Sequence, residues 1–255
     1  MATASRMGLV LAVLFGMPRF AIAQADEIQV YDGGLAGVGV FNLTWHNNYT
    51  PDGLTESAFP GAVVSDQALV GVMEWAYGVN SWFEAGLYLP LYSIDKDQGL
   101  TVNGAKLRTL FAVPNAADRT FFYGANFEFS YNAKRWDPRR ITSEIRPIIG
   151  WHLDPIDLIV NPILDTTYEG GLGNLEVVPA MRLAYNISPT WAVAVEEYAD
   201  LGLLDDLLPG AEQAHQLYGC LNYVGRVEVE AGVGFGLTDA ADSLTLKLIL
   251  AADLN

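Results

Sequence analysis

The chain has 255 residues, of which 51% are hydrophobic and 17% charged, and its formal net charge is −16. Beyond the N-terminus no apolar run approaches the ~20 residues of a membrane-spanning helix, so the apolar residues must be dispersed in short elements. Because phosphate binding needs clustered Lys and Arg, this acidic balance argues against nucleic acid as a partner. The single cysteine, Cys220, excludes an intrachain disulfide and a multi-cysteine metal site.

The first 25 residues predict a cleavable secretory signal peptide. Arg6 supplies the positive start, and residues 7–17 form an apolar run that is of signal length but too short to cross a membrane. Small-x-small patterns end at Ala23 and at Ala25, and we expect cleavage after Ala25. An N-terminal amphipathic helix is the alternative, which the uniform apolarity of the run disfavours. We therefore expect a signal peptide over 1–25 and one domain over 26–255.

Apolar residues then recur with a period of two. Over residues 121–131, Phe121 and Tyr123 belong to one face and Asn126 and Glu128 to the other, as in a strand with one apolar and one polar side. Strong or weak copies predict strands at 41–45, 73–79, 83–91, 105–113, 121–131, 145–151, 158–164, 177–185, 191–195, 217–223, 227–235 and 244–250. This pattern predicts an all-β domain, an antiparallel transmembrane β-barrel of about twelve strands.

Short and long connections alternate between these strands. Short turns are expected near 80–81, 115–119, 154–155, 188–189 and 224–225, and longer outer loops near 47–67, 93–101, 132–142, 167–174, 201–214 and 238–243. This alternation is typical of outer-membrane barrels, so we expect the protein in the bacterial outer membrane, surrounded by lipid. Pro147, Pro162 and Pro179 lie inside predicted strands, where proline cannot donate to a ladder, and we expect either bulges there or wrong strand assignments.

If the apolar face meets lipid, the polar face lines the lumen. Its charged residues are the candidate lumen-lining (pore) residues: Glu74, Glu84, Lys106, Arg108, Glu128, Glu144, Arg146, Asp165, Glu176, Arg182, Glu196, Glu228, Glu230 and Lys247. Because buried charges must be paired or solvated, two interpretations stay open. The barrel is a narrow pore or transporter that selects small solutes by charge, or it is a closed structural or adhesion barrel with a salt-bridged lumen.

Enzymatic chemistry finds little support in the sequence. The histidines are His46, His152 and His215, and we expect His46 and His215 near the outer rim, where a lipid-modifying barrel enzyme would work. No histidine stands beside a serine at the spacing of an outer-membrane phospholipase, and no phosphate loop, metal-binding histidine pair or dinucleotide fingerprint is present. We therefore expect no enzyme, no cofactor and no metal site, and a lipid-modifying enzyme is the third hypothesis.

Several segments also resemble a family of uncharacterised proteobacterial exported proteins regarded as outer-membrane barrels. They are 26–32 (DEIQVYD), 47–53 (NNYTPDG), 74–78 (EWAYG), 82–90 (WFEAGLYLP) and 144–150 (EIRPIIG). The resemblance spans most of the mature chain and implies an outer-membrane, transporter-like protein, loosely similar to barrels associated with the degradation of phenol and other aromatic hydrocarbons. It implies no catalytic residues. The chain departs from many such barrels by ending in Asn255 rather than in an aromatic residue.

Overall fold

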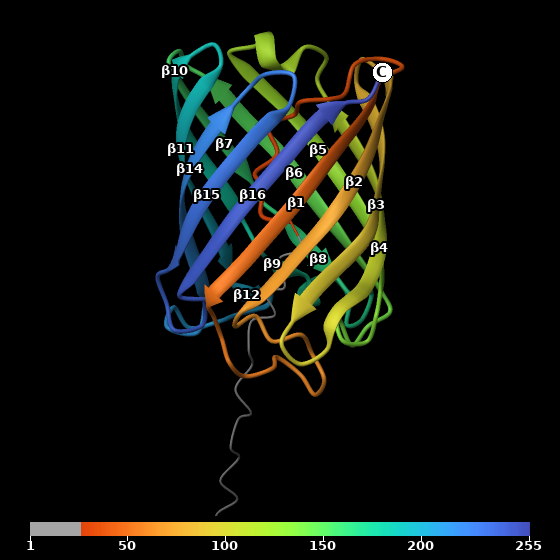
Figure 1. Cartoon of the computed structure of the whole chain (residues 1–255), viewed down its shortest axis with the longest axis vertical. Coiled ribbons are helices and arrows are strands. Elements are labelled where there is room, and N and C mark those ends of the chain that lie inside the picture. The colour runs from red at the N-terminus through yellow and green to blue at the C-terminus, as the bar shows by residue number, and fades with distance from the viewer. Residues whose placement is uncertain (1–26) are drawn as a thin grey trace, which may run out of the picture.

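Residues 27–255, which a computed structural model describes, form a closed antiparallel barrel of twelve strands (Figure 1). Its β segments are β1 (Phe41–Asp52), β2 (Ala68–Asn80), β3 (Phe83–Asp95), β4 (Gly99–Ala112), β5 (Phe121–Asn132), β6 (Ile141–His152), β7 (Ile156–Asn161), β8 (Leu164–Thr166), β9 (Glu176–Val177), β10 (Ala180–Ser188), β11 (Trp191–Asp200), β12 (Gly202–Leu203), β13 (Asp206–Leu207), β14 (Ala214–Tyr223), β15 (Glu228–Gly236) and β16 (Leu244–Asp253). Two 3-10 turns, η1 (Ala116–Asp118) and η2 (Leu172–Asn174), lie in connections. The predicted fold class is confirmed. The expected signal peptide lies outside the described residues.

The ring closes because every barrel strand has a partner on both sides. β1 pairs with β2 and with β16, while β6 pairs with both β7 and β8. β7 and β8 form one barrel strand interrupted at Pro162, and β9 and β10 form the next, interrupted at Pro179. The strands predicted as continuous over 158–164 and 177–185 are therefore interrupted, so these two assignments were wrong in the way that the prolines indicated. Pro147 is different, because it stays inside β6 opposite Ala125 with no shift in register, so the expectation of a bulge or a wrong strand assignment there is wrong.

The two ends of the barrel differ in their connections. One end, called the turn end, carries residues 81–82, 113–120, 153–155, 189–190 and 224–227 between strands, together with the start of β1 and the end of β16. The other end, called the loop end, carries residues 53–67, 133–140, 167–175 and 237–243. Two expectations need correction, because β1 continues to Asp52 and the connection between β3 and β4 is only residues 96–98. The strands are longer than predicted because their backbone hydrogen bonds continue at the loop end, where apolar and polar residues no longer alternate clearly.

Alternate residues face opposite sides of the wall. On β5, Phe121, Tyr123 and Phe129 are exposed on the outside, whereas Asn126 and Glu128 are buried on the inside. Large apolar side chains are exposed in the same way on other strands of the ring. Such a continuous apolar outer surface is unfavourable in water and suits lipid. Among the described residues no helix is long and apolar enough to cross a membrane.

The chain before β1 lies inside the barrel, a feature that the sequence did not reveal. This segment, residues 27–37, is called the plug and occupies the half of the lumen nearer the turn end (Figure 1). It packs through Val30 and Tyr31 on inward side chains such as Phe122. The chain leaves at the turn end, where the Gly39 amide donates to the carbonyl of Gly78 at 2.8 Å. A side chain at Gly78 would collide with the plug's own carbonyls, so glycine is required for this close approach.

Candidate functional site in the barrel lumen

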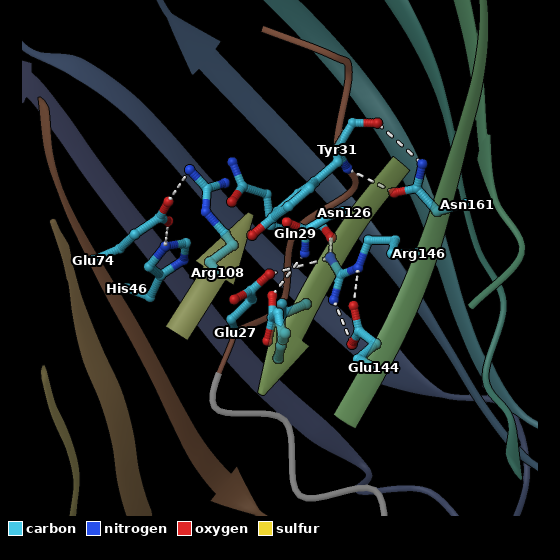
Figure 2. A network of polar contacts seen from close by, with 12 residues as sticks. Glu27, Gln29, Tyr31, His46, Glu74, Arg108, Asn126, Glu144, Arg146 and Asn161 are labelled. Carbon is cyan, nitrogen blue, oxygen red and sulfur yellow. Dashed lines mark hydrogen bonds and ion pairs between the residues drawn. The ribbon is translucent and has the colours of Figure 1, made fainter. Parts of the chain in front are cut away.

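Side chains of the wall complete the hydrogen bonding of the plug backbone. Asn161 on β7 is fully buried and makes two of these bonds, accepting from the Tyr31 amide at 2.7 Å and donating to the Tyr31 carbonyl at 3.0 Å (Figure 2). Arg146 donates from Nη1 to the Gln29 carbonyl at 2.9 Å. A strand-like segment without a neighbouring strand needs such partners, because buried peptide groups are costly when unpaired. The plug is therefore a specifically bound segment.

Tyr31 is the central side chain of the plug. Its ring lies under two guanidinium groups, at 4.5 Å from Arg146 and 5.5 Å from Arg108 (Figure 2). Cations over an aromatic face are attracted by its electron density. The Tyr31 hydroxyl is hydrogen-bonded to the hydroxyl of Tyr88 on β3. One plug residue thereby contacts four barrel strands.

A first buried ionic cluster lies on β1 to β4. Arg108 is paired with Glu74 at 2.8 Å and also with Glu84, and His46 Nε2 lies 3.2 Å from Glu74 Oε2. All four side chains are almost fully buried. Glu84 also accepts from the plug amide of Ala36 at 2.5 Å. Burial of these charges is tolerable because each has an opposite charge or a donor beside it.

A second cluster lies on β10 to β16. Lys247 on β16 is paired with Glu196 of β11 and lies 2.6 Å from Glu230 of β15. Arg182 on β10 contacts the same two carboxylates, with Glu230 at 3.0 Å. Lys247 also donates to the plug carbonyl of Ile28 at 3.2 Å. The two clusters thus contact the plug at two places, the first at Ala36 and the second at Ile28.

Cys220 lies beside this second cluster. In the part of the chain that the structure describes, Glu196, Cys220 and Glu230 have donor atoms close enough together to hold a metal ion. Both carboxylates, however, are already bound by Lys247 and Arg182. A metal ion would have to displace two positive side chains, so the local charge is unsuitable for a metal centre.

A cavity of about 280 Å³ lies between the plug and the loop end, and it is called the loop-end chamber. Glu27 and Gln29 of the plug contribute to its lining, as do acidic side chains from β5, β6, β8 and β9. Arg146 binds Glu144 from Nε at 2.7 Å and lies 3.1 Å from Glu27. Lys106 lies 3.2 Å from Glu128. The chamber wall therefore carries more negative than positive charge.

The loop of residues 53–67 covers part of this chamber. Asp242, from the connection between β15 and β16, accepts hydrogen bonds from the Leu54 amide at 2.8 Å and from the Ser65 hydroxyl at 2.5 Å. Asp66 is paired with Lys96 at 3.0 Å, and this hydrogen bond lowers the pKa of the Asp66 carboxyl. The loop is thus tied to both of its neighbouring connections.

The candidate residues from the sequence group as follows. The first cluster contains Glu74, Glu84 and Arg108; the chamber is lined by Lys106, Glu128, Glu144, Arg146, Asp165 and Glu176; the second cluster contains Arg182, Glu196, Glu230 and Lys247. Glu228 is not brought to any of them, because it is exposed at the start of β15, at the turn end. Sequence reasoning missed Glu27, Tyr31 and Asn161. The alternation of Glu27, Gln29 and Tyr31 with apolar residues was a signal for the first two.

The histidines lie apart from one another. His46 is in the middle of β1, buried in the lumen against Glu74, so its expected place at the outer rim is wrong. Its side chain lies on the polar face of a strand that is longer than predicted. His215 does lie at the loop end, where its ring is hydrogen-bonded to Glu197 and Gln213. Neither partner is a nucleophile of the serine or cysteine type.

The closed barrel, its apolar outside and its polar lumen are those of the β-barrels of bacterial outer membranes. No protein-family model matches the chain. No curated protein matches it either.

Solved structures do match the fold. The COG4313 outer membrane channel from Pseudomonas putida F1 is 13% identical, with a TM-score of 0.60, over 89% of this chain and 100% of that one. The KdgM porin in complex with disordered oligogalacturonate is 7% identical, with a TM-score of 0.53, over 84% of this chain and 99% of that one. LpxR from Salmonella typhimurium reaches a TM-score of only 0.41, at 6% identity over 83% of this chain and 99% of that one, which carries no argument about activity. These likenesses show the fold alone.

Proposed function

We propose that the protein is a narrow outer-membrane channel for small solutes, and that the plug closes it in the state described here. The turn end would face the periplasm and the loop end the outside. The observation that carries this proposal is that a separate segment, and not the wall alone, fills the inner half of the lumen. Wall contacts to the plug include hydrogen bonds and ion pairs, which can exchange with water, beside the apolar packing of Val30 and Tyr31. Removal of the plug would leave a polar passage.

Support comes from the outward apolar surface and from the polar inner wall. The likeness to the Pseudomonas channel and to the KdgM porin agrees with it at the level of the fold. The hydrogen bonds of His215 go to Glu197 and Gln213, neither of which is a serine or a cysteine, and the proposal assigns no catalytic role.

The test compares the full chain with a variant that lacks residues 28–36, both purified and inserted into planar lipid bilayers. We expect small or rare currents from the full chain and a several-fold larger conductance from the deletion variant. Circular dichroism and resistance to unfolding in detergent establish that the variant is a folded barrel. A folded deletion variant that conducts no better than the full chain would contradict the proposal and would favour a closed structural barrel.

A further inference from the structure

Four acidic residues lie in direct cross-strand register on the wall of the loop-end chamber. Glu128 of β5 is opposite Glu144 of β6, which is opposite Asp165 of β8, which in turn is opposite Glu176 of β9. All four line the chamber. Like charges directly opposite one another are unfavourable in a sheet. A row of four therefore works against stability unless positive charge is supplied.

Among the described residues, direct ion pairs reach only one end of this row, although Arg139 also lies in the chamber lining. Lys106 lies 3.2 Å from Glu128, and Arg146 lies 2.7 Å from Glu144. Within residues 27–255, no ion pair or hydrogen bond reaches the carboxylates of Asp165 and Glu176. These two acids on neighbouring strands are left to solvent or to a ligand.

Glu27 of the plug provides a second, independent observation. It is only 8% exposed, and it lies in the lining of the same chamber. Arg146 approaches one of its carboxylate oxygens, but among the described residues Glu27 makes no hydrogen bond. A buried carboxylate oxygen that accepts no hydrogen bond is unfavourable, so a donor that enters the chamber would gain by reaching Glu27.

The chamber also has an apolar side next to the two unpaired acids. Ile163 and Asp165 share a face, as do Glu176 and Val178, and the Val178 amide donates to the Ile163 carbonyl at 3.1 Å. Two aliphatic side chains therefore adjoin two carboxylates on neighbouring strands. Tyr198 adds an aromatic surface to the lining. A ligand that suits this wall has a positive group at one end and an apolar body.

The arrangement does not suit a bare metal ion. Metal sites need several donor atoms within bonding distance of one point. Among the described residues, the group that meets this condition lies in the second cluster and not in the chamber. The chamber volume of about 280 Å³ is close to the lower end of the range for small-molecule sites.

We propose that the loop-end chamber binds a small organic cation, a primary ammonium group on an aromatic or branched aliphatic body. The ammonium group is held by Asp165 and Glu176, and the body rests on Ile163 and Val178. This proposal names a solute class for the proposed channel, and its role in transport rests on that function. The binding itself rests only on the chamber.

The test measures binding by isothermal titration calorimetry on the full chain in detergent, with three probes of one shape. Benzylamine carries the positive charge, benzyl alcohol is neutral and benzoate is negative. We expect saturable binding of benzylamine, at least tenfold weaker binding of benzyl alcohol, and no binding of benzoate. Equal affinity for benzylamine and benzyl alcohol would overturn the proposal.

A double variant, Asp165→Asn with Glu176→Gln, keeps the side-chain sizes and removes both charges. We expect at least a tenfold loss of benzylamine affinity, while the barrel folds at least as well because repulsion is relieved. The matched control is Glu228→Gln, at the exposed turn end, which should bind as the parent does. Unchanged affinity in the double variant would refute the site.

Two further outcomes separate this proposal from the channel function. Magnesium chloride and sodium chloride are compared as competitors at equal ionic strength. Displacement of benzylamine by magnesium chloride but not by sodium chloride would overturn the organic-cation proposal in favour of a metal site. If the full chain binds benzylamine but the plug-deletion variant does not conduct, the channel function is refuted and the binding site stands. If the deletion variant conducts but the full chain does not bind benzylamine, the binding site is refuted and the channel function stands.

Discussion

Asn161→Ala is the smallest change that should release the plug. Asn161 contacts both peptide groups of Tyr31 and is fully buried. Each of the two hydrogen bonds contributes about 0.5–1.5 kcal/mol net, so their loss should weaken plug binding by about 1–3 kcal/mol. That corresponds to a factor of about 5–150 in the ratio of open to closed barrels. Alanine leaves the wall of the barrel in place because it fits any strand position.

Single-channel recording in planar bilayers measures this ratio as the open probability. We expect the variant to open more often than the parent while the conductance of each full opening stays the same. Asn186→Ala is the matched control, because Asn186 lies on β10 and donates to Asp157 rather than to the plug. The control should behave as the parent does.

An open probability that is unchanged in Asn161→Ala, in a barrel shown to be folded, would refute the reasoning. It would mean that the plug is held by its ring contacts and ion pairs, or that the lumen is sealed by the wall alone. A rise in Asn186→Ala equal to that in Asn161→Ala would refute it as well, because loosening of the wall would then explain both.

Two other substitutions test the lumen. Lys247→Met leaves Glu196 and Glu230 with less positive charge in a buried place, so it should destabilise the barrel by about 3–5 kcal/mol in urea unfolding. Adding Glu196→Gln should restore part of that loss, and no restoration would contradict the pairing. Gly78→Val places a side chain against the plug carbonyl of Ala36, so we expect displaced plugs and a higher conductance. A folded Gly78→Val barrel with parental conductance would show that the plug leaves the lumen elsewhere.

The wall of the barrel was predictable because it depends on local pattern. On β5, alternation alone assigns Phe121 and Tyr123 to one face and Asn126 and Glu128 to the other, as found. Pro147 shows where local reasoning fails. A proline interrupts a strand only where its missing N–H would have donated a hydrogen bond to a neighbouring strand. In β6 the pairing with β5 continues past Pro147, which lies opposite Ala125.

The plug and the ionic clusters were not predictable from the sequence, for a different reason. The alternation around Tyr31 looks like that of any strand, and nothing local states whether such a strand joins the wall or enters the lumen. Lys247 and Glu196 lie on β16 and β11, with β14 and β15 between them. Which charges meet across a lumen depends on register and curvature, which no single segment encodes.

The plug has no binding site until the barrel exists. Its partners Tyr88, Arg146, Asn161 and Lys247 lie on β3, β6, β7 and β16, which are spread around the ring. These side chains reach the same segment only when the strands between them have paired. Plug binding is therefore a late step of folding, which follows strand pairing and can fail without loss of the barrel wall.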